Sequence, residues 1–342
     1  MTKKYQVVGI GNAVSDVIAK TSDEFLSENN VTKGIMQLID ETRAAALFSA
    51  MKERTETPGG SVANTISGLG SLGVSTAFIG RVADDDLGLS YASSMVAEGT
   101  DFPNDPVVNA ELPTSRSMIF ISPDGERSMN TYLGISSDVG PSDVSENVVS
   151  DCDFLFLEGY LFDKDPGKAA FRKAADQAQS SGARAGISLS DPFCVDRHRD
   201  DFRSLVSGSL DYFLCNEEEL KSLYQTEDLT DGLTQGAADC NLVVCTRSSD
   251  GVSICQGAMR WDVPVVPITP VDATGAGDQF AAGFLYGLVQ GFDPETCGKI
   301  GGIAAGEVIG HVGPRAATSI ADMLKEKGIG KLTGRENATV KV

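Results

Sequence analysis

An aspartate that follows a glycine-rich segment offers the clearest chemistry in this sequence. The segment Val271–Gly277 leads into Asp278 and then into the amphipathic apolar run Gln279–Val289. This pattern predicts a loop that opens a helix. Small residues allow backbone N–H groups to approach an anion, and a helix N-terminus adds about half a positive charge. A terminal phosphate would fit against the three small residues before the aspartate, Gly275, Ala276 and Gly277.

Asp278 itself indicates proton transfer rather than phosphate binding. A carboxylate would repel the phosphate, but it is well placed to accept the proton of an attacking hydroxyl. We therefore predict that Asp278 is the catalytic base of a phosphoryl transfer to an alcohol. The alternative is an ordinary first helical turn with a capping acid.

The composition argues against several other classes of function. The 342 residues carry 28 basic and 48 acidic side chains, a net charge of -20, so nucleic acid is not an expected partner. Only two histidines are present, His198 and His311, which leaves little material for a zinc site or a Ser-His-Asp triad. Seven dispersed cysteines without a CxxC pair indicate reduced thiols and a cytoplasmic protein. No apolar run is long enough to predict a membrane span.

Short apolar runs alternate with helical patterns along most of the chain. This alternation predicts the α/β class, with a mostly parallel central sheet that helices cover on both faces. The predicted strands are Tyr5–Gly11, Thr76–Val82, Asp153–Glu158, Ala183–Leu189, Leu210–Asn216 and Asn241–Thr246, and the predicted helices between them include Pro166–Ser181, Glu217–Tyr224 and Thr230–Asp239.

One region departs from this alternation. Two strand-like runs, Thr114–Ser122 and Arg127–Leu133, flank the turn sequence PDGE and predict a hairpin. With Val14–Lys20 and Gly34–Ile39 it would form a small sheet, too thin to fold alone, that lies over the main domain as a lid. We expect one domain over residues 1–330, with a discontinuous β lid at about 12–40 and 106–135, and a weakly ordered tail over 331–342.

Two motifs together identify a family. The first is DATGAGD at 272–278, and the second is PGGSVAN at 58–64, which LGSLG at 69–73 and IGRV at 79–82 follow. They resemble the signatures of the ribokinase-like sugar and nucleoside kinases, the PfkB family, with Ala273 where threonine is common. The order and spacing agree over roughly residues 5–322. The resemblance implies a ribokinase-like three-layer α/β/α sandwich, ATP as phosphate donor and Mg²⁺.

The resemblance also assigns an acceptor site. It implies that Asp16 binds two sugar hydroxyls and that Gly60 and Asn64 assist it. A carboxylate can accept hydrogen bonds from adjacent hydroxyls, although without the resemblance an exposed turn acid would be the better interpretation of Asp16. Asn12 stands in the same loop as Asp16, and Met36 could line an apolar slot for a base or belong to the core.

Further residues match the nucleotide side of the family's site. Asn216 and Glu219 match NxxE, in which the glutamate helps to hold hydrated Mg²⁺, and the alternative is a plain N-capped helix. Arg127 would be the lid cation that reaches the transferring phosphoryl group, or else a solvated hairpin arginine. Near the phosphates the resemblance also leaves open a monovalent cation such as K⁺ beside Asp272.

The remaining predicted nucleotide contacts lie in two loops and in the glycine segment. Residues 246–251 resemble the TxGxxG loop, with Ser248 in place of the first glycine. From these segments we predict contacts of ATP with Thr246, Gly251, Thr274 and Gly277, and with His311 near the adenine, although His311 could equally be structural.

The sequence leaves several alternative functions and acceptors to consider. Val14 occupies the third glycine position of a dinucleotide fingerprint, and no GxxxxGK(S/T) is present, so neither a dehydrogenase nor a P-loop NTPase is expected. Asn12, the stretch 130–134 and the stretch 157–160 are more similar to the adenosine-kinase-like branch. We therefore favour the 5'-hydroxyl of a nucleoside such as adenosine as acceptor. A ribokinase-like or fructokinase-like sugar kinase, a non-catalytic sensor on the same fold, and a monomer or a homodimer stay open.

Overall fold

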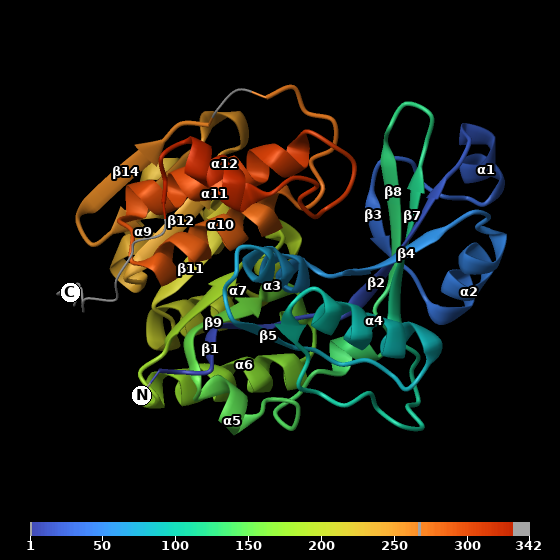
Figure 1. The fold of residues 1–342 in the computed structure, drawn as a ribbon, viewed down its shortest axis with the longest axis horizontal. Helices are drawn as coiled ribbons and strands as arrows, with labels where there is room; N and C mark the ends of the chain where they lie inside the picture. The colour runs from blue at the N-terminus through green and yellow to red at the C-terminus, as the bar shows by residue number, and fades with distance from the viewer. Residues whose placement is uncertain (1, 266–267, 331–342) are drawn as a thin grey trace.

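The computed structural model describes residues 2–265 and 268–330, and its larger part is built on a nine-stranded sheet (Figure 1). The strand order is β14-β13-β12-β11-β10-β9-β1-β5-β6, parallel from β12 to β6 and antiparallel at β13 and β14. The bounds are β1 Tyr5–Ile10, β5 Thr76–Ile79, β6 Thr100–Asp101, β9 Cys152–Glu158, β10 Arg184–Ser188, β11 Tyr212–Asn216, β12 Leu242–Thr246, β13 Val252–Gln256 and β14 Met259–Val263. The mostly parallel sheet expected from the sequence is confirmed.

Helices cover both faces of this sheet and enclose one apolar core on each side (Figure 1). One layer contains α5 Glu146–Val149, α6 Asp165–Ser180, α7 Pro192–Ser209, α8 Glu217–Tyr224 and α9 Leu229–Asp239. The other contains α3 Ser61–Ser71, α4 Asp86–Ala97, α10 Ala276–Gln290, α11 Pro294–Ile309 and α12 Ile320–Glu326. This is the three-layer α/β/α sandwich. Within the described ranges, no helix is long and apolar enough to cross a bilayer.

A second, five-stranded sheet stands beside the sandwich, on the right in Figure 1. Its order is β3-β8-β7-β2-β4, with bounds β2 Val14–Lys20, β3 Met36–Leu38, β4 Thr55–Gly59, β7 Ser115–Ile121 and β8 Arg127–Tyr132. Helices α1 Asp23–Glu28 and α2 Glu41–Ala50 pack on one face around Val17, Leu47 and Phe120. We call this sheet with its two helices the lid. The predicted hairpin and both additional strands are present in it.

Strand β4 is a component of the lid that the sequence did not lead us to expect. It is the edge strand beside β2, and the residues from Thr55 to Thr57 are polar and largely exposed. Pro58 fits there because an edge strand does not need every N–H in its ladder. The tail predicted at 331–342 lies outside the described residues.

β4 continues directly into α3 through Gly60, without an intervening loop. Gly60 has φ +101°, a conformation that favours glycine, and a Cβ there would lie 2.2 Å from the backbone oxygen of Asn12. Any other residue at position 60 would therefore push apart the start of α3 and the loop after β1.

Candidate active site

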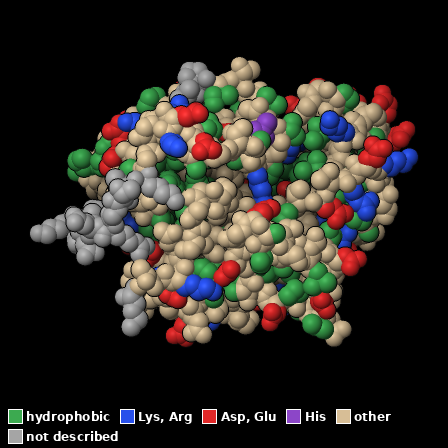
Figure 2. All heavy atoms as spheres, viewed as in Figure 1, with side chains coloured by type: hydrophobic (Ala, Val, Ile, Leu, Met, Phe, Trp, Pro, Cys, Tyr) green, Lys and Arg blue, Asp and Glu red, His purple; other side chains and the backbone are tan. Residues whose placement is uncertain are grey.

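A cavity of about 920 Å³ lies between the lid and the carboxyl ends of the parallel strands. This is the usual place for a ligand in an open α/β sheet. Eleven of the predicted site residues line it: Asn12, Asp16, Met36, Gly60, Asn64, Asn216, Glu219, Thr246, Thr274, Gly277 and Asp278. On the face shown in Figure 2, lysines and arginines are scattered and form no broad basic patch.

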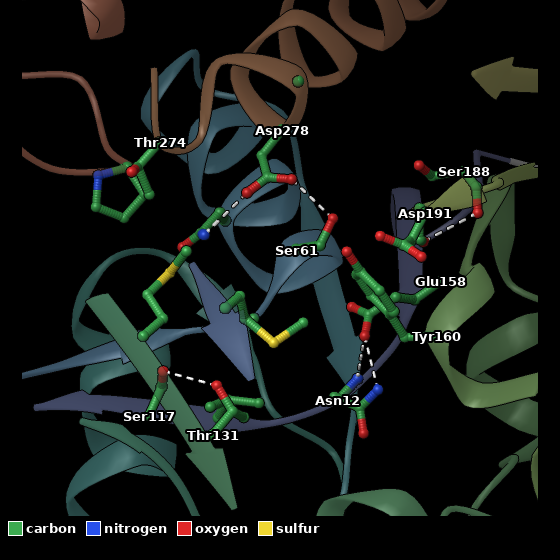
Figure 3. A pocket seen from close by; sticks show the side chains of 18 of the residues that line it. Asn12, Ser61, Ser117, Thr131, Glu158, Tyr160, Ser188, Asp191, Thr274 and Asp278 are labelled. Carbon is green, nitrogen blue, oxygen red and sulfur yellow. Dashed lines mark hydrogen bonds between the residues drawn. The ribbon is translucent and has the colours of Figure 1, made fainter. Parts of the chain in front are cut away.

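Asp278 lies in the first turn of α10, where two side chains of α3 hold its carboxylate (Figure 3). Ser61 Oγ donates to one oxygen at 2.7 Å and Asn64 Nδ2 donates to the other at 3.0 Å. Burial raises the pKa of Asp278 to about 6, against the opposing effect of both hydrogen bonds. The carboxylate is thus fixed in place and easily protonated near neutrality, as a general base should be. Ser61 was not predicted, although a hydroxyl directly after two glycines at a helix start is a usable signal.

The glycine segment before Asp278 has the shape of an anion cradle. Gly275 is the left-handed N-cap of α10, with φ +75°, and a Cβ there would lie 2.5 Å from Pro314 Cα. Gly277 lines the cavity, and a Cβ there would meet no protein atom within 4 Å. The space over the helix N-terminus is therefore open to a ligand, and a phosphate fits its charge. Gly275 and Ala276 do not themselves line the cavity.

Asp16 projects from β2 into the cavity and is buried. Burial raises its pKa to about 7, and within residues 2–265 and 268–330 no hydrogen bond reaches its carboxylate. Gly59 makes room for it, since a Cβ at position 59 would lie 2.4 Å from the carboxylate carbon. Arg315 and Arg127 oppose the rise in the pKa of Asp16 through their charges. A buried carboxylate that accepts no hydrogen bond is costly, so Asp16 is suited to receive ligand hydroxyls.

Glu158, at the end of β9, is a site residue that the sequence analysis did not assign. Its carboxylate accepts hydrogen bonds from the backbone N–H of Asn12 at 3.1 Å and from Asn12 Nδ2 at 2.8 Å (Figure 3). It also accepts one from Val62 N–H at 3.0 Å. Burial raises the pKa of Glu158 to about 7 although these three donors oppose it. Ser136 Oγ donates to Asn12 Oδ1, so the Asn12 side chain is held by protein on both sides. Glu158 thereby fixes the loop after β1 to the start of α3.

Arg127 is buried rather than solvated, so the alternative of an exposed hairpin arginine is wrong. Its guanidinium lies 2.9 Å from the Asp272 carboxylate, and this ion pair joins the lid to the glycine segment. Arg127 does not itself line the cavity. Burial pushes the pKa of Asp272 up, but the N–H groups of Gly313 and Thr274, with Arg127, lower it overall. A K⁺ ion beside Asp272 would compete with Arg127 for the same carboxylate. The phosphoryl contact of Arg127 stays a prediction.

Asn216 and Glu219 form a capping box at the start of α8. Asn216 donates to both carboxylate oxygens, through its N–H at 3.0 Å and its Nδ2 at 2.7 Å. Burial raises the pKa of Glu219 to about 7. Direct coordination of Mg²⁺ would disrupt the cap, so the donor set fits only a contact through water. No group of three or more His, Cys, Asp or Glu side chains in the described ranges could hold a metal.

The other predicted nucleotide contacts divide into two groups. Thr246 lines the cavity, and its hydroxyl donates to Cys215 O at 3.3 Å. Gly251 and His311 do not line it, and His311 Nε2 lies 3.1 Å from Glu307. Ser248, which stands where the family has glycine, adopts the left-handed conformation with φ +50°. The loop thus keeps a conformation suited to glycine, and the ATP contacts of Gly251 and His311 stay predictions.

Three of the buried carboxyl groups that line the cavity predict a sharp dependence of activity on pH. Asp278, Asp16 and Glu158 all face this site with pKa values raised to about 6 or 7. Each must be ionised to accept hydrogen bonds or a proton, so kcat/KM for the acceptor should rise as pH increases through about 6 to 7. Below pH 6 we expect a slope of log kcat/KM steeper than one, because more than one proton must leave. Initial rates between pH 4.5 and 9 would check this, and a flat profile from pH 5 upward would contradict it.

Comparison with known proteins agrees with this geometry. The sequence matches the pfkB family carbohydrate kinases over residues 28–321. The structure is similar to a probable sugar kinase from Rhizobium etli, at 43% identity and a TM-score of 0.88, over 96% of this chain and 100% of that one. It is also similar to the adenosine kinase from Sinorhizobium meliloti, at 44% identity and a TM-score of 0.87, over 95% and 99%. An ATP-dependent ribose-1-phosphate kinase from Halopiger xanaduensis is 26% identical over 88% of this chain and 98% of its own.

The family match covers most of the chain, and the segments 58–64 and 272–278 meet at the cavity, where Asn64 contacts the Asp278 carboxylate. The fold is therefore ribokinase-like, and the small molecules that such kinases phosphorylate are sugars or nucleosides. This chain belongs to the pfkB family of carbohydrate kinases.

Proposed function

We propose that this kinase transfers the γ-phosphate of ATP to the 5'-hydroxyl of a nucleoside such as adenosine. The observation that carries the proposal is the composition of the lid face of the cavity. Asp16 is available there for sugar hydroxyls, and an apolar surface against which a planar base could stack lines the same cavity. That surface consists of Ile35, Met36, Leu38, Ile119 and Met129. The 44% identity to a protein named adenosine kinase supports the same acceptor.

The charges around the cavity argue against a phosphorylated acceptor. Such a substrate would call for a cation near Asp16 that is free to contact its phosphate. Arg315 and Arg127 lie near enough to lower the pKa of Asp16, but Arg315 pairs with Glu98 and Arg127 pairs with Asp272. Arg116 lies on the other face of the lid, 5.0 Å from the Phe48 ring centroid. Among the described residues that line the cavity the one cation is Arg197, whose guanidinium pairs with Asp163 at 2.9 Å. An uncharged acceptor fits better.

In the proposed mechanism each residue has a simple task. Asp16 orients the sugar, and Asp278 accepts the proton of the attacking hydroxyl. Ser61 and Asn64 hold the Asp278 carboxylate in place, and the N-terminus of α10 stabilises the negative charge of the transferred phosphoryl group. Arg127 would add a positive charge if it exchanged Asp272 for the phosphate. Mg²⁺, when bound, neutralises phosphate charge, and Glu219 and Asn216 would contact it through water.

The test is ADP release with Mg²⁺ and ATP across adenosine, inosine, guanosine, cytidine, ribose, fructose and fructose phosphates. We expect turnover on a nucleoside, with kcat/KM at least tenfold above that for free ribose. Turnover only on a free or phosphorylated sugar would overturn the nucleoside acceptor and leave a sugar kinase. Binding of an acceptor without any turnover would favour a sensor.

The seven cysteines are all unpaired and buried, which supports a reducing, cytoplasmic location.

A further inference from the structure

Two hydroxyl groups form a hydrogen-bonded pair in the cavity wall and have no role in the site described so far. Ser117 on β7 and Thr131 on β8 both line the cavity, and their oxygens lie 2.8 Å apart (Figure 3). Either oxygen can be the donor. Neither residue contacts Asp278 or the glycine segment in the hydrogen bonds of the described residues.

The register of the lid strands places this pair next to Asp16, the residue proposed to bind the sugar. Asp16 is directly opposite Ser117, and Ser117 is directly opposite Thr131. Adjacent strands lie about 4.8 Å apart, so the pair begins one strand from Asp16 and ends two strands from it. Leu38 follows Thr131 on the next strand and closes the row. A ligand whose sugar rests on Asp16 would therefore extend over the two hydroxyls.

The next row along the same strands is apolar. Ile119 is opposite Met129, and Met129 is opposite Met36. Of the described lid residues that line the cavity, Ser117 and Thr131 are the only polar ones besides Asp16. A few polar groups in an otherwise apolar pocket wall fix the orientation of the ligand and determine specificity.

We propose that the Ser117–Thr131 pair is the specificity determinant that reads the polar edge of the acceptor's base, an inference that rests on the proposed function. The mutual hydrogen bond uses one of the two O–H groups, which leaves one O–H donor and several acceptor lone pairs. This set matches a heterocycle edge with one acceptor beside one donor, such as N1 and the 6-amino group of adenine. Because hydroxyls rotate, the pair can adjust which oxygen donates.

The experiment compares adenosine with purine riboside, which keeps N1 but lacks the 6-amino donor. In the wild-type protein we expect kcat/KM to favour adenosine by about tenfold or more, since a lost hydrogen bond leaves a site hydroxyl unpaired. In the double variant Ser117→Ala, Thr131→Val this ratio should fall towards one, because adenosine loses the contacts of both N1 and the 6-amino group whereas purine riboside loses the N1 contact alone. The value of kcat/KM for ribose, which has no base, should stay within about threefold of wild type. Thr55→Val, at an exposed position of β4, is the matched control and should leave the ratio unchanged.

Each outcome decides a separate point. If the wild type phosphorylates nucleosides and the double variant keeps its preference for adenosine, the base-reading role is wrong while the proposed function stands. An equal loss on adenosine, purine riboside and ribose would show a merely structural pair and would also overturn the inference. If the wild type uses no nucleoside, the proposed function and the inference both fail.

Discussion

Replacement of Asp278 by asparagine should lower kcat by about 10³-fold while the protein stays folded. The amide keeps the size of the carboxylate and can still hydrogen-bond to Ser61 and Asn64, but it cannot accept the proton of the attacking hydroxyl. General-base catalysis typically contributes 10²- to 10⁴-fold. The measurement is single-turnover phosphoryl transfer at saturating ATP and acceptor. A correctly folded Asp278→Asn protein with near-wild-type turnover would exclude this base.

The same variant should be more stable than the wild type at high pH. The pKa of Asp278 is raised from 3.8 to about 6 in the folded chain, so the unfolded state ionises first and the wild type loses stability between about pH 4 and pH 6. Two pKa units correspond to up to about 3 kcal/mol. Thermal unfolding at pH 4 and pH 8 should show a smaller loss of stability in Asp278→Asn than in the wild type. Asp16, Glu158 and Glu219, whose pKa values burial also raises, contribute equally to the loss in both proteins. Asp322→Asn, at an exposed position in the first turn of α12, is the control and should behave as the wild type.

Asp16→Asn should have the second largest effect, and it should act on the acceptor alone. The carboxylate is buried and accepts no hydrogen bond from the described residues, so two ligand hydroxyls can both bond to it when it is ionised. Loss of two such charge-assisted hydrogen bonds, each about 1.5 to 3 kcal/mol, predicts a fall in kcat/KM for the acceptor of about 10² to 10⁴. The KM for ATP should stay within about twofold.

The Asp16 prediction is tested by measuring the effect of the variant on each substrate separately. Steady-state kinetics with ATP and acceptor varied in turn gives the two effects, with Asp23→Asn on the exposed start of α1 as the control. Comparable losses for ATP and acceptor would mean that Asp16 supports the fold of the site rather than the sugar. Unchanged kinetics would place the acceptor elsewhere in the cavity.

The elements that the sequence predicted well have strong local signals. The parallel strands are short apolar runs, and the lid hairpin has a proline and a glycine in its turn, so both could be recognised without tertiary information. β4 escaped prediction because an exposed edge strand needs no apolar residues, and its sequence from Thr55 contains proline and glycine. β13 and β14 were missed too, although the two residues between them form a recognisable hairpin turn.

The parts of the site that could not be predicted depend on long-range contacts. Ser61 meets Asp278 across 217 positions of the chain, and Asn12 meets Glu158 across 146. The raised pKa values of the carboxyl groups follow from burial, which no single motif encodes. The position of Arg127 was predicted on the lid, but its pairing with Asp272 depends on how the lid meets the glycine segment.

The direct passage of β4 into α3 has a thermodynamic consequence. One uninterrupted stretch of backbone carries the strand beside Asp16 and the two side chains, Ser61 and Asn64, that hold Asp278. A displacement of the lid would therefore move Ser61 and Asn64 and, through them, the Asp278 carboxylate. The free energies of binding of the acceptor at Asp16 and of ATP near Asp278 would then be linked. Such linkage is reciprocal, so the factor by which one substrate raises the affinity for the other is the same in both directions.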